Sequence, residues 1–174
     1  MSGPNPSMPR GPKDATAILF VCLGNICRSP LAAGVFTHMA AARNAADRFV
    51  VDSCGLGGWH AGEPADPRSI AVARKYGISL KGRARRVTPE SDFAGFDLLV
   101  PMDTANKRGL LELGALPQRV RMMRSFDPDL AGLADERLEV PDPYTGGPRE
   151  FEDVYRMLVS ACEGMLDELL RRRG

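Results

Sequence analysis

The stretch ILFVCLGNICRSP, residues 18–30, constrains the fold more than any other part of the chain. It begins within an apolar run, residues 17–22, which is typical of a strand buried on both faces of a parallel sheet. Pro30 suits the first turn of a helix, where its missing N–H costs nothing, and helical spacing continues to about Asn44. A short loop therefore joins the carboxyl end of a buried strand to a helix, which is where ligands bind in α/β folds.

Strands and helices alternate along the rest of the chain, which predicts a parallel sheet with helices on both faces and right-handed crossovers. We expect an α/β single-domain three-layer fold with a four-stranded sheet. The three further strands are expected at residues 49–53, 96–102 and 120–124. Helices are expected at residues 67–76, 104–113 and from 151 to the C-terminus, the first two capped by Asp66 and Asp103.

Length and composition indicate an ordinary soluble domain. The 174 residues suit one domain, residues 16–174, after a tail of residues 1–15 that four prolines predict to be disordered. The net charge of +1 favours neither nucleic acid nor a membrane surface as a partner. No apolar run approaches the roughly 20 residues of a membrane span, and no apolar signal core precedes the domain. We expect a cytoplasmic protein, with secretion by another route left open, and a monomer or weak dimer.

The loop after the first strand has the residues of an anion site. Backbone amides at the start of a helix attract anions, and Gly24 and Asn25 tolerate left-handed backbone angles. Arg28 offers a fork of donors that matches two phosphate oxygens, and Ser29 could donate a hydrogen bond to a thiolate. Cys22 alone would more often be a small buried apolar residue. Together with these neighbours it indicates phosphoryl transfer to sulfur, whereas the Gly-Lys-Ser/Thr of a Walker loop is missing.

These residues carry a resemblance to a known family. CLGNICRS is similar to the C-x5-R-S signature of the low-molecular-weight protein tyrosine phosphatases, and DPY at 142–144 is similar to their second motif. The resemblance covers about residues 16–172. It implies hydrolysis of phosphotyrosine proteins without a metal or cofactor, with Cys22 as nucleophile, Arg28 as phosphate clamp and Asp142 as general acid and then base. It also implies that the loop binds the phosphate through Leu23, Gly24, Asn25, Ile26, Cys27 and Ser29.

The acid and the rim of the cleft depend on the resemblance. Asp-Pro pairs commonly start turns, and Asp127-Pro128 is a second such pair, so only the DPY context selects Asp142. In the family, aromatic residues at the positions of Trp59 and Tyr144 line the mouth of the cleft. Core packing is the alternative for Trp59, although its glycine-rich loop favours exposure.

The sequence departs from the family at three positions. Thr145 replaces the second Tyr that many relatives carry after DPY, so the rim should be less aromatic. Some relatives have a His at the position of Gly82 that supports the loop's Asn and a Ser, here Ser53, so Asn25 must be held otherwise. Ile26 stands where arginine phosphatases of the family have Thr, which favours tyrosine substrates. The segment RARR, residues 83–86, is either a docking patch for acidic partners or, more often for such runs, a solvated or ion-paired surface.

A second thiol lies in the same loop. Cys27 either packs beneath the loop as a small apolar residue or intercepts an oxidised Cys22 as a disulfide, as relatives with this pair are thought to do.

Other enzyme classes fit less well. A cysteine protease needs a His base, and only His38 and His60 are present. Zinc sites need ligand spacings that are missing here. An arsenate reductase of the same fold needs a close pair of resolving cysteines, which Cys54 and Cys162 do not form, and DPY favours the phosphatase. A non-catalytic phosphate-binding module is the remaining alternative, but it would not need both Cys22 and Asp142.

Overall fold

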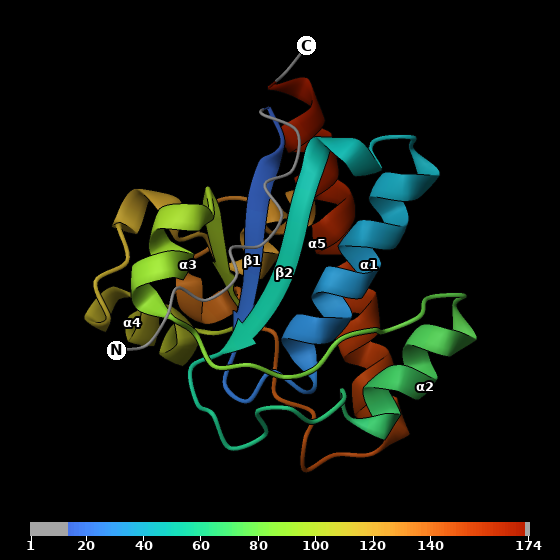
Figure 1. Ribbon diagram of the computed structural model, residues 1–174. Helices are drawn as coiled ribbons and strands as arrows, with labels where there is room; N and C mark the ends of the chain where they lie inside the picture. The colour runs from blue at the N-terminus through green and yellow to red at the C-terminus, as the bar shows by residue number, and fades with distance from the viewer. Residues whose placement is uncertain (1–13, 173–174) are drawn as a thin grey trace.

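The computed structural model describes residues 14–172, so residues 1–13 of the predicted tail, 1–15, lie outside the described residues (Figure 1). The elements in chain order are β1 (Thr16–Cys22), α1 (Arg28–Ala42), β2 (Phe49–Gly55), α2 (Pro67–Lys75), α3 (Pro89–Gly95), β3 (Leu98–Pro101), α4 (Thr104–Glu112) and α5 (Pro148–Arg171). Short 3₁₀ turns occupy Ala46–Arg48, Pro117–Arg119, Met123–Phe126, Pro128–Leu130 and Asp135–Arg137. Among residues 14–172, no helix is long and apolar enough to span a membrane.

The sheet is parallel, with β1 in the centre between β2 and β3. All of its strands therefore end at one edge, and Figure 1 shows β1 and β2 pointing toward the loops that gather there. Cys22, the last residue of β1, pairs in register with Gly55, the last of β2. The loop after β2 therefore begins beside the loop after β1, at the edge of the sheet where the sequence predicted ligand binding.

The predicted fourth strand is wrong. Val120 forms only an isolated parallel bridge with Leu99 of β3, in which the Arg121 N–H donates to the Leu99 carbonyl over 3.0 Å. The chain then leaves the sheet because Met123 and Phe126 turn into the core on a 3₁₀ turn, where both are buried. The described sheet has three strands.

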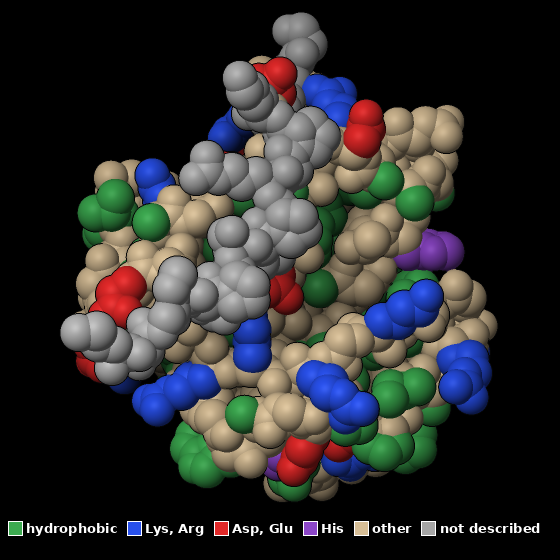
Figure 2. Space-filling model, in the orientation of Figure 1, with side chains coloured by type: hydrophobic (Ala, Val, Ile, Leu, Met, Phe, Trp, Pro, Cys, Tyr) green, Lys and Arg blue, Asp and Glu red, His purple; other side chains and the backbone are tan. Residues whose placement is uncertain are grey.

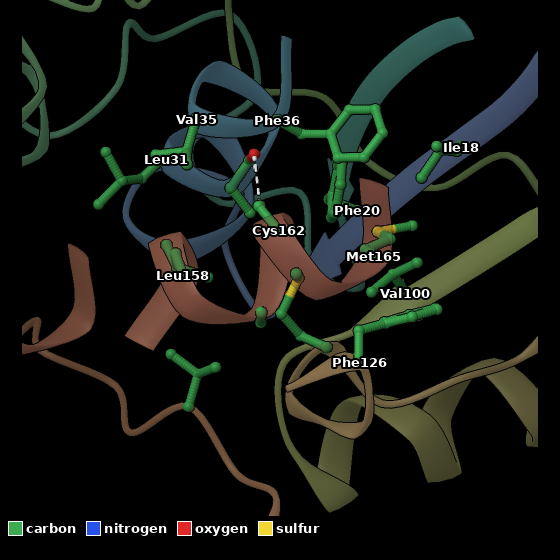
Figure 3. Packing of buried hydrophobic residues seen from close by; sticks show 14 of the residues in the cluster. Ile18, Phe20, Leu31, Val35, Phe36, Val100, Phe126, Leu158, Cys162 and Met165 are labelled. Atoms are coloured by element: carbon green, nitrogen blue, oxygen red, sulfur yellow. Dashed lines mark hydrogen bonds between the residues drawn. The ribbon is translucent and has the colours of Figure 1, made fainter. Parts of the chain in front are cut away.

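Two apolar cores cover the two faces of the sheet. Ile18 and Phe20 of β1 point into the larger core, which α1 and α5 close (Figure 3). Leu19 and Val21 point to the opposite face, into a smaller core with Phe96 and Leu110. Alternation along β1 thus buries both faces, as the continuous apolar run predicted, and the α/β architecture is confirmed.

Local signals set most helix ends. Asp66 caps α2 by accepting the Arg68 N–H over 2.8 Å, and Asp103 caps α4 by accepting the Asn106 N–H over 2.7 Å. The sequence reading missed α3, a short helix that begins at Pro89. It also placed the start of α1 near Pro30, whereas the helix begins at Arg28 and carries Arg28 and Ser29 in its first turn.

Candidate active site

The loop after β1 converges on the sulfur of Cys22. The Asn25 N–H donates to Cys22 Sγ over 3.3 Å, and Ser29 Oγ lies 2.9 Å from the same sulfur. The sulfur thus sits at the N-terminus of α1, where backbone amides and the helix dipole favour negative charge. The predicted anion site therefore has a thiol at its base.

Asn25 holds the loop in shape. Its backbone is left-handed, with φ +59°, as the sequence predicted, whereas Gly24 is not left-handed. Its side-chain amide donates to Ser29 Oγ over 2.8 Å and to Ser53 Oγ over 2.9 Å, so Ser53 of β2 supports the loop as expected. A side chain on Gly55 would approach the Leu23 carbonyl to 2.8 Å, so glycine at the end of β2 permits this close packing.

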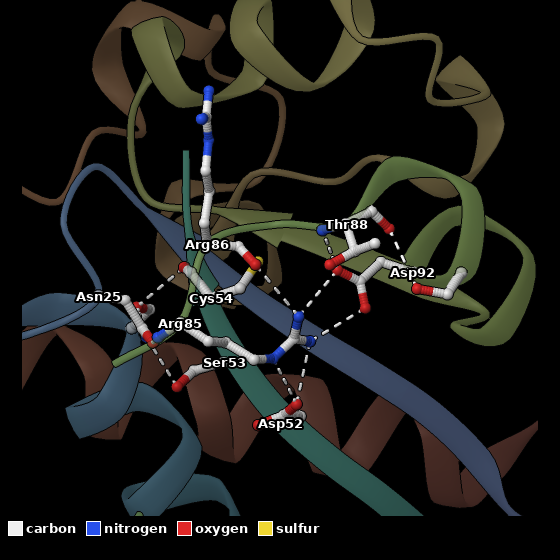
Figure 4. Close-up of polar contacts among 10 residues, drawn as sticks. Asn25, Asp52, Ser53, Cys54, Arg85, Arg86, Thr88 and Asp92 are labelled. Carbon is white, nitrogen blue, oxygen red and sulfur yellow. Dashed lines mark hydrogen bonds and ion pairs between the residues drawn. The ribbon is translucent and has the colours of Figure 1, made fainter. Parts of the chain in front are cut away.

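The backbone of Arg85 completes the support of Asn25. The Arg85 N–H donates to Asn25 Oδ1 over 2.9 Å, and the Arg85 guanidinium bonds Asp52 and Asp92 at 2.9 to 3.0 Å (Figure 4). Gly82 has a left-handed backbone, with φ +97°, and its position is exposed. The expectation that Asn25 is held without a histidine at position 82 is therefore met by the Arg85 N–H. The ion pairs of Arg85 with Asp52 and Asp92 fix the position of that N–H.

The other arginines of residues 83–86 brace the loop after β2. Arg83 donates to the Gly62 carbonyl over 3.0 Å, and Arg86 donates to the Leu56 carbonyl over 3.2 Å. Of the two readings of RARR, these contacts favour a structural, hydrogen-bonded surface. Figure 2 shows Lys and Arg interspersed with Asp and Glu on one face of the molecule, in keeping with the net charge of +1.

Arg28 is buried and held from two sides. Its Nη1 donates to Asp103 Oδ2 over 2.7 Å and to the Val140 carbonyl over 2.9 Å. Its Nη2 lies 3.6 Å from Asp142 Oδ2. The sequence reading assigned Asp103 only a capping role, but one carboxylate oxygen caps α4 while the other orients Arg28.

A pocket of about 170 Å³ brings most of the predicted site together. Its lining residues are Cys22, Leu23, Gly24, Ile26, Cys27, Arg28, Trp59, His60, Asp142 and Tyr144. Asn25, Ser29 and Ser53 lie behind this wall and hold it through hydrogen bonds. Asp127, the other Asp-Pro aspartate, instead caps a 3₁₀ turn by accepting the Asp129 N–H over 3.0 Å.

The mouth of the pocket is aromatic and exposed. Trp59 is 71% exposed and Tyr144 is 51% exposed, so core packing of Trp59 is excluded. The sequence reading missed His60, whose ring lies 6.4 Å from that of Tyr144 and whose Nδ1 is 2.8 Å from Glu63 Oε2. The position of His60 next to Trp59 in one loop was the available sequence signal. Only the folded chain shows that His60 lines the pocket and lies beside Gly24 of the cysteine loop.

The four cysteines occupy different environments. Burial, reinforced by Asp66 and Asp142, raises the pKa of the Cys27 thiol to about 12. Cys54 and Cys162 are fully buried in the cores on opposite faces of the sheet, and burial raises the pKa of both thiols. They cannot form the resolving pair that an arsenate reductase would need.

Comparison with known proteins agrees with this geometry. The family model "Low molecular weight phosphotyrosine protein phosphatase" matches residues 17–173. The phosphatase of that name from Sus scrofa is 37% identical over 88% of this chain and 95% of its own. Low molecular weight protein-tyrosine phosphatase A of Mycobacterium bovis is 42% identical over 92% of this chain and 98% of its own.

Solved structures show the same likeness. The structure of YfkJ from Bacillus subtilis superposes with a TM-score of 0.82, at 32% identity, over 92% of this chain and 98% of its own. A protein tyrosine phosphatase from Entamoeba histolytica superposes with a TM-score of 0.82, at 33% identity, over 92% of this chain and 100% of its own. The thiol in an anion-binding loop and these matches over nearly the whole chain lead to one conclusion: the protein belongs to the low molecular weight phosphotyrosine protein phosphatase family.

Proposed function

We propose that this phosphatase hydrolyses phosphotyrosine in proteins through a phosphocysteine intermediate, with Cys22 as nucleophile. The observation that carries the proposal is the convergence of the Asn25 amide and the Ser29 hydroxyl on Cys22 Sγ, at 3.3 and 2.9 Å, inside the pocket that also holds Arg28 and Asp142. The proposal includes a cytoplasmic location and a monomer or weak dimer, and sedimentation of the purified protein tests the latter.

In the first step, Cys22 Sγ attacks phosphorus and the bond to the phenolic oxygen breaks. The phenolate of tyrosine has a pKa of about 10, so it needs a proton as it leaves. Asp142, on the loop before α5, donates that proton and becomes a carboxylate. Arg28 binds equatorial phosphoryl oxygens through Nε and Nη2, because its Nη1 already serves Asp103 and Val140.

In the second step, water attacks the phosphocysteine. Asp142 now accepts a proton from that water, the sulfur–phosphorus bond breaks, and inorganic phosphate and the Cys22 thiolate are released. The Ser29 hydroxyl, 2.9 Å from the sulfur, stabilises the departing thiolate by donating a hydrogen bond. Asn25 keeps that hydroxyl in place, because its amide donates to Ser29 Oγ. The hydroxyl proton then has two acceptors, the sulfur at 2.9 Å and the Cys54 carbonyl at 3.4 Å, and the closer sulfur receives it when it carries negative charge.

The walls of the pocket suit a flat aromatic leaving group. Trp59 and Tyr144 stand at the mouth, and the side chains of Leu23 and Ile26 line the interior. The apolar side chain of Ile26 offers contact to a phenyl ring but no hydrogen bond to a guanidinium. These features support phosphotyrosine over phosphoarginine as the substrate class.

Replacing Asp142 with Ala tests the proton donor. We expect kcat/KM for a phosphotyrosine peptide to fall about 100-fold or more, because general acid catalysis contributes on this scale. The value for p-nitrophenyl phosphate should fall far less, since nitrophenolate leaves without much help. The matched control is Asp127→Ala, which removes the other Asp-Pro carboxylate and should leave both values nearly unchanged. Equal losses on both substrates would exclude Asp142 as the acid.

Peroxide treatment tests Cys27. We propose that peroxide oxidises Cys22 to a sulfenic acid, that Cys27 sulfur displaces its oxygen as water, and that a thiol reductant later cleaves the Cys22–Cys27 disulfide. Cys27→Ser should keep phosphatase activity but recover poorly after peroxide and dithiothreitol, whereas Cys162→Ala should recover like the wild type. Equal recovery of Cys27→Ser and the wild type would leave Cys27 with only a packing role.

The raised pKa of Cys27 adds a pH dependence to this reaction. Because its thiol is protonated at neutral pH and the thiolate is the attacking form, the thiolate fraction grows about tenfold with each pH unit below pH 12. Disulfide closure, measured by mass spectrometry after a peroxide pulse, should therefore accelerate from pH 6 to pH 8. A rate that is constant over this range would show that Cys27 does not attack as a thiolate generated by this equilibrium.

A further inference from the structure

The first turn of α2 touches the phosphate-binding loop. The Asp66 N–H donates to the Ile26 carbonyl over 2.8 Å, and Ser69 Oγ donates to the Cys27 carbonyl over 3.1 Å. Both donors are on buried residues. The start of α2 thus helps fix the backbone on which Cys27 and Arg28 lie.

Arg68, in the same turn, reaches in the other direction to the loop that carries Asp142. Its Nη1 donates to the Gly146 carbonyl over 2.8 Å and its Nη2 donates to the Tyr144 carbonyl over 2.9 Å. The same guanidinium bonds both oxygens of Asp66 at 3.0 Å. Its Cζ also lies 4.5 Å from the ring centre of the buried Phe151 of α5, a cation–π contact.

The contact continues from Tyr144 to the acid itself. The Tyr144 N–H donates to Asp142 Oδ1 over 3.1 Å, while Asp142 Oδ2 faces Arg28 at 3.6 Å. Arg68 also lies 5.8 Å from the centre of the Tyr144 ring at the pocket mouth. Tyr144 therefore connects three parts of the site: its carbonyl accepts from Arg68, its N–H donates to the Asp142 carboxylate, and its ring stands at the pocket mouth.

We propose that Arg68 is a positioning residue for the proton transfer: it ties the loop of Asp142 to the turn that supports the phosphate loop, and so sets where the carboxyl stands above Cys22. The inference rests on the proposed role of Asp142. Residues 141–147 contain two prolines and two glycines and no regular secondary structure, so their backbone needs such an external tie. Direct binding of substrate is a poor alternative for Arg68, because four of its five N–H donors are already engaged.

Two substitutions distinguish the hydrogen bonds of Arg68 to the loop of Asp142 from its positive charge. Arg68→Ala removes both, whereas Arg68→Lys keeps a cation beside Asp66 but replaces four hydrogen bonds, spread over three nitrogens of a planar group, with at most three from a single nitrogen. We expect both variants to lose about tenfold or more of kcat/KM for a phosphotyrosine peptide, since small misplacement of a catalytic group costs on this scale. The loss on p-nitrophenyl phosphate should be several-fold smaller. Arg74→Ala, an exposed arginine of the same helix, is the control and should behave as wild type.

A merely structural role predicts a different pattern. If Arg68 only stabilised the fold, both substrates would lose activity alike, and the inhibition constant of inorganic phosphate would rise because the anion loop is disturbed. We expect that constant to stay within about twofold of the wild type, since Arg28 and the loop amides remain in place. Circular dichroism melting of each variant establishes that the measured protein is folded. If Arg68→Ala does not fold, Arg68→Lys alone provides the test.

The decisive measurement is a double-mutant cycle with Asp142→Ala. If Arg68 acts through the acid, adding Arg68→Lys to Asp142→Ala should change kcat/KM for the peptide by less than about twofold. Multiplied losses in the double variant would overturn the inference while leaving Asp142 as the acid. Equal losses of Asp142→Ala on both substrates would instead overturn the proposed function, so the two failures are distinguishable.

Discussion

Cys22→Ser will reduce turnover of p-nitrophenyl phosphate and of a phosphotyrosine peptide by at least about 10,000-fold, as when a covalent nucleophile is removed from other enzymes. The hydroxyl of serine is far less acidic than a thiol, and among residues 14–172 no base lies within hydrogen-bonding distance of Cys22 Sγ to activate it. The sulfur accepts contacts from Asn25 and Ser29, neither of which can remove a proton at neutral pH. Steady-state rates of a preparation free of wild-type enzyme provide the measurement.

The same variant should still bind oxyanions. Arg28 and the loop amides do not depend on the sulfur, because Asn25 is held by Ser53 and Arg85 and Arg28 by Asp103. Titration calorimetry with inorganic phosphate should therefore give a dissociation constant close to that of the wild type. Cys162→Ala provides a matched loss of a thiol in the core and should retain activity. Substantial activity of Cys22→Ser would remove Cys22 from the mechanism.

Arg28→Lys will lower kcat by about 100-fold to 1,000-fold, the cost of removing one preorganised donor from a charge-developing site. Lysine keeps the positive charge, but it cannot hold Asp103 and the Val140 carbonyl while also presenting two donors to the phosphoryl group. We expect the lysine ammonium to pair with Asp103 and therefore not to contact the phosphoryl group. Steady-state kinetics and the inhibition constant of phosphate give the measurement.

The control for Arg28→Lys separates chemistry from folding. Arg28 is 2% exposed, so any change there risks a loss of stability. Arg121→Lys replaces an arginine that pairs with Glu168 away from the pocket and should cost no activity. If folded Arg28→Lys keeps a kcat close to that of the wild type, the guanidinium has only a structural role and does not stabilise the transition state.

Much of the phosphate loop could be predicted because its signals are local. The apolar run, Asn25, Arg28, Ser29 and Pro30 lie within 14 residues, and each acts on its immediate backbone. Left-handed Asn25 and the exposed Trp59 followed from residue type and loop composition. Asp66 and Asp103 were recognised as caps for the same reason, since a cap acts within three residues of itself.

The fourth strand was mispredicted because strand formation depends on a distant partner. The segment after Val120 has the apolar composition of a strand, and Val120 does reach β3. Composition does not reveal that Met123 and Phe126 complete the larger core instead of extending the ladder. Burial of these side chains, a tertiary effect, outweighed one or two further sheet hydrogen bonds.

The partners of the proposed catalytic groups could not be predicted from any local pattern. Asp103 meets Arg28 across 75 residues, the Arg85 N–H meets Asn25 across 60, and Arg68 meets the Tyr144 and Gly146 carbonyls across 76 and 78. Residue types and spacings along the chain identify the thiol, the arginine and the helix start, because those properties are set by neighbours. Which carboxylate orients Arg28 depends on the pairing of β3 beside β1, because that pairing brings Asp103 to the same edge of the sheet. Which guanidinium binds the loop of Asp142 depends on how α2 packs against α1 and α5, because that packing brings Arg68 beside residues 144–146.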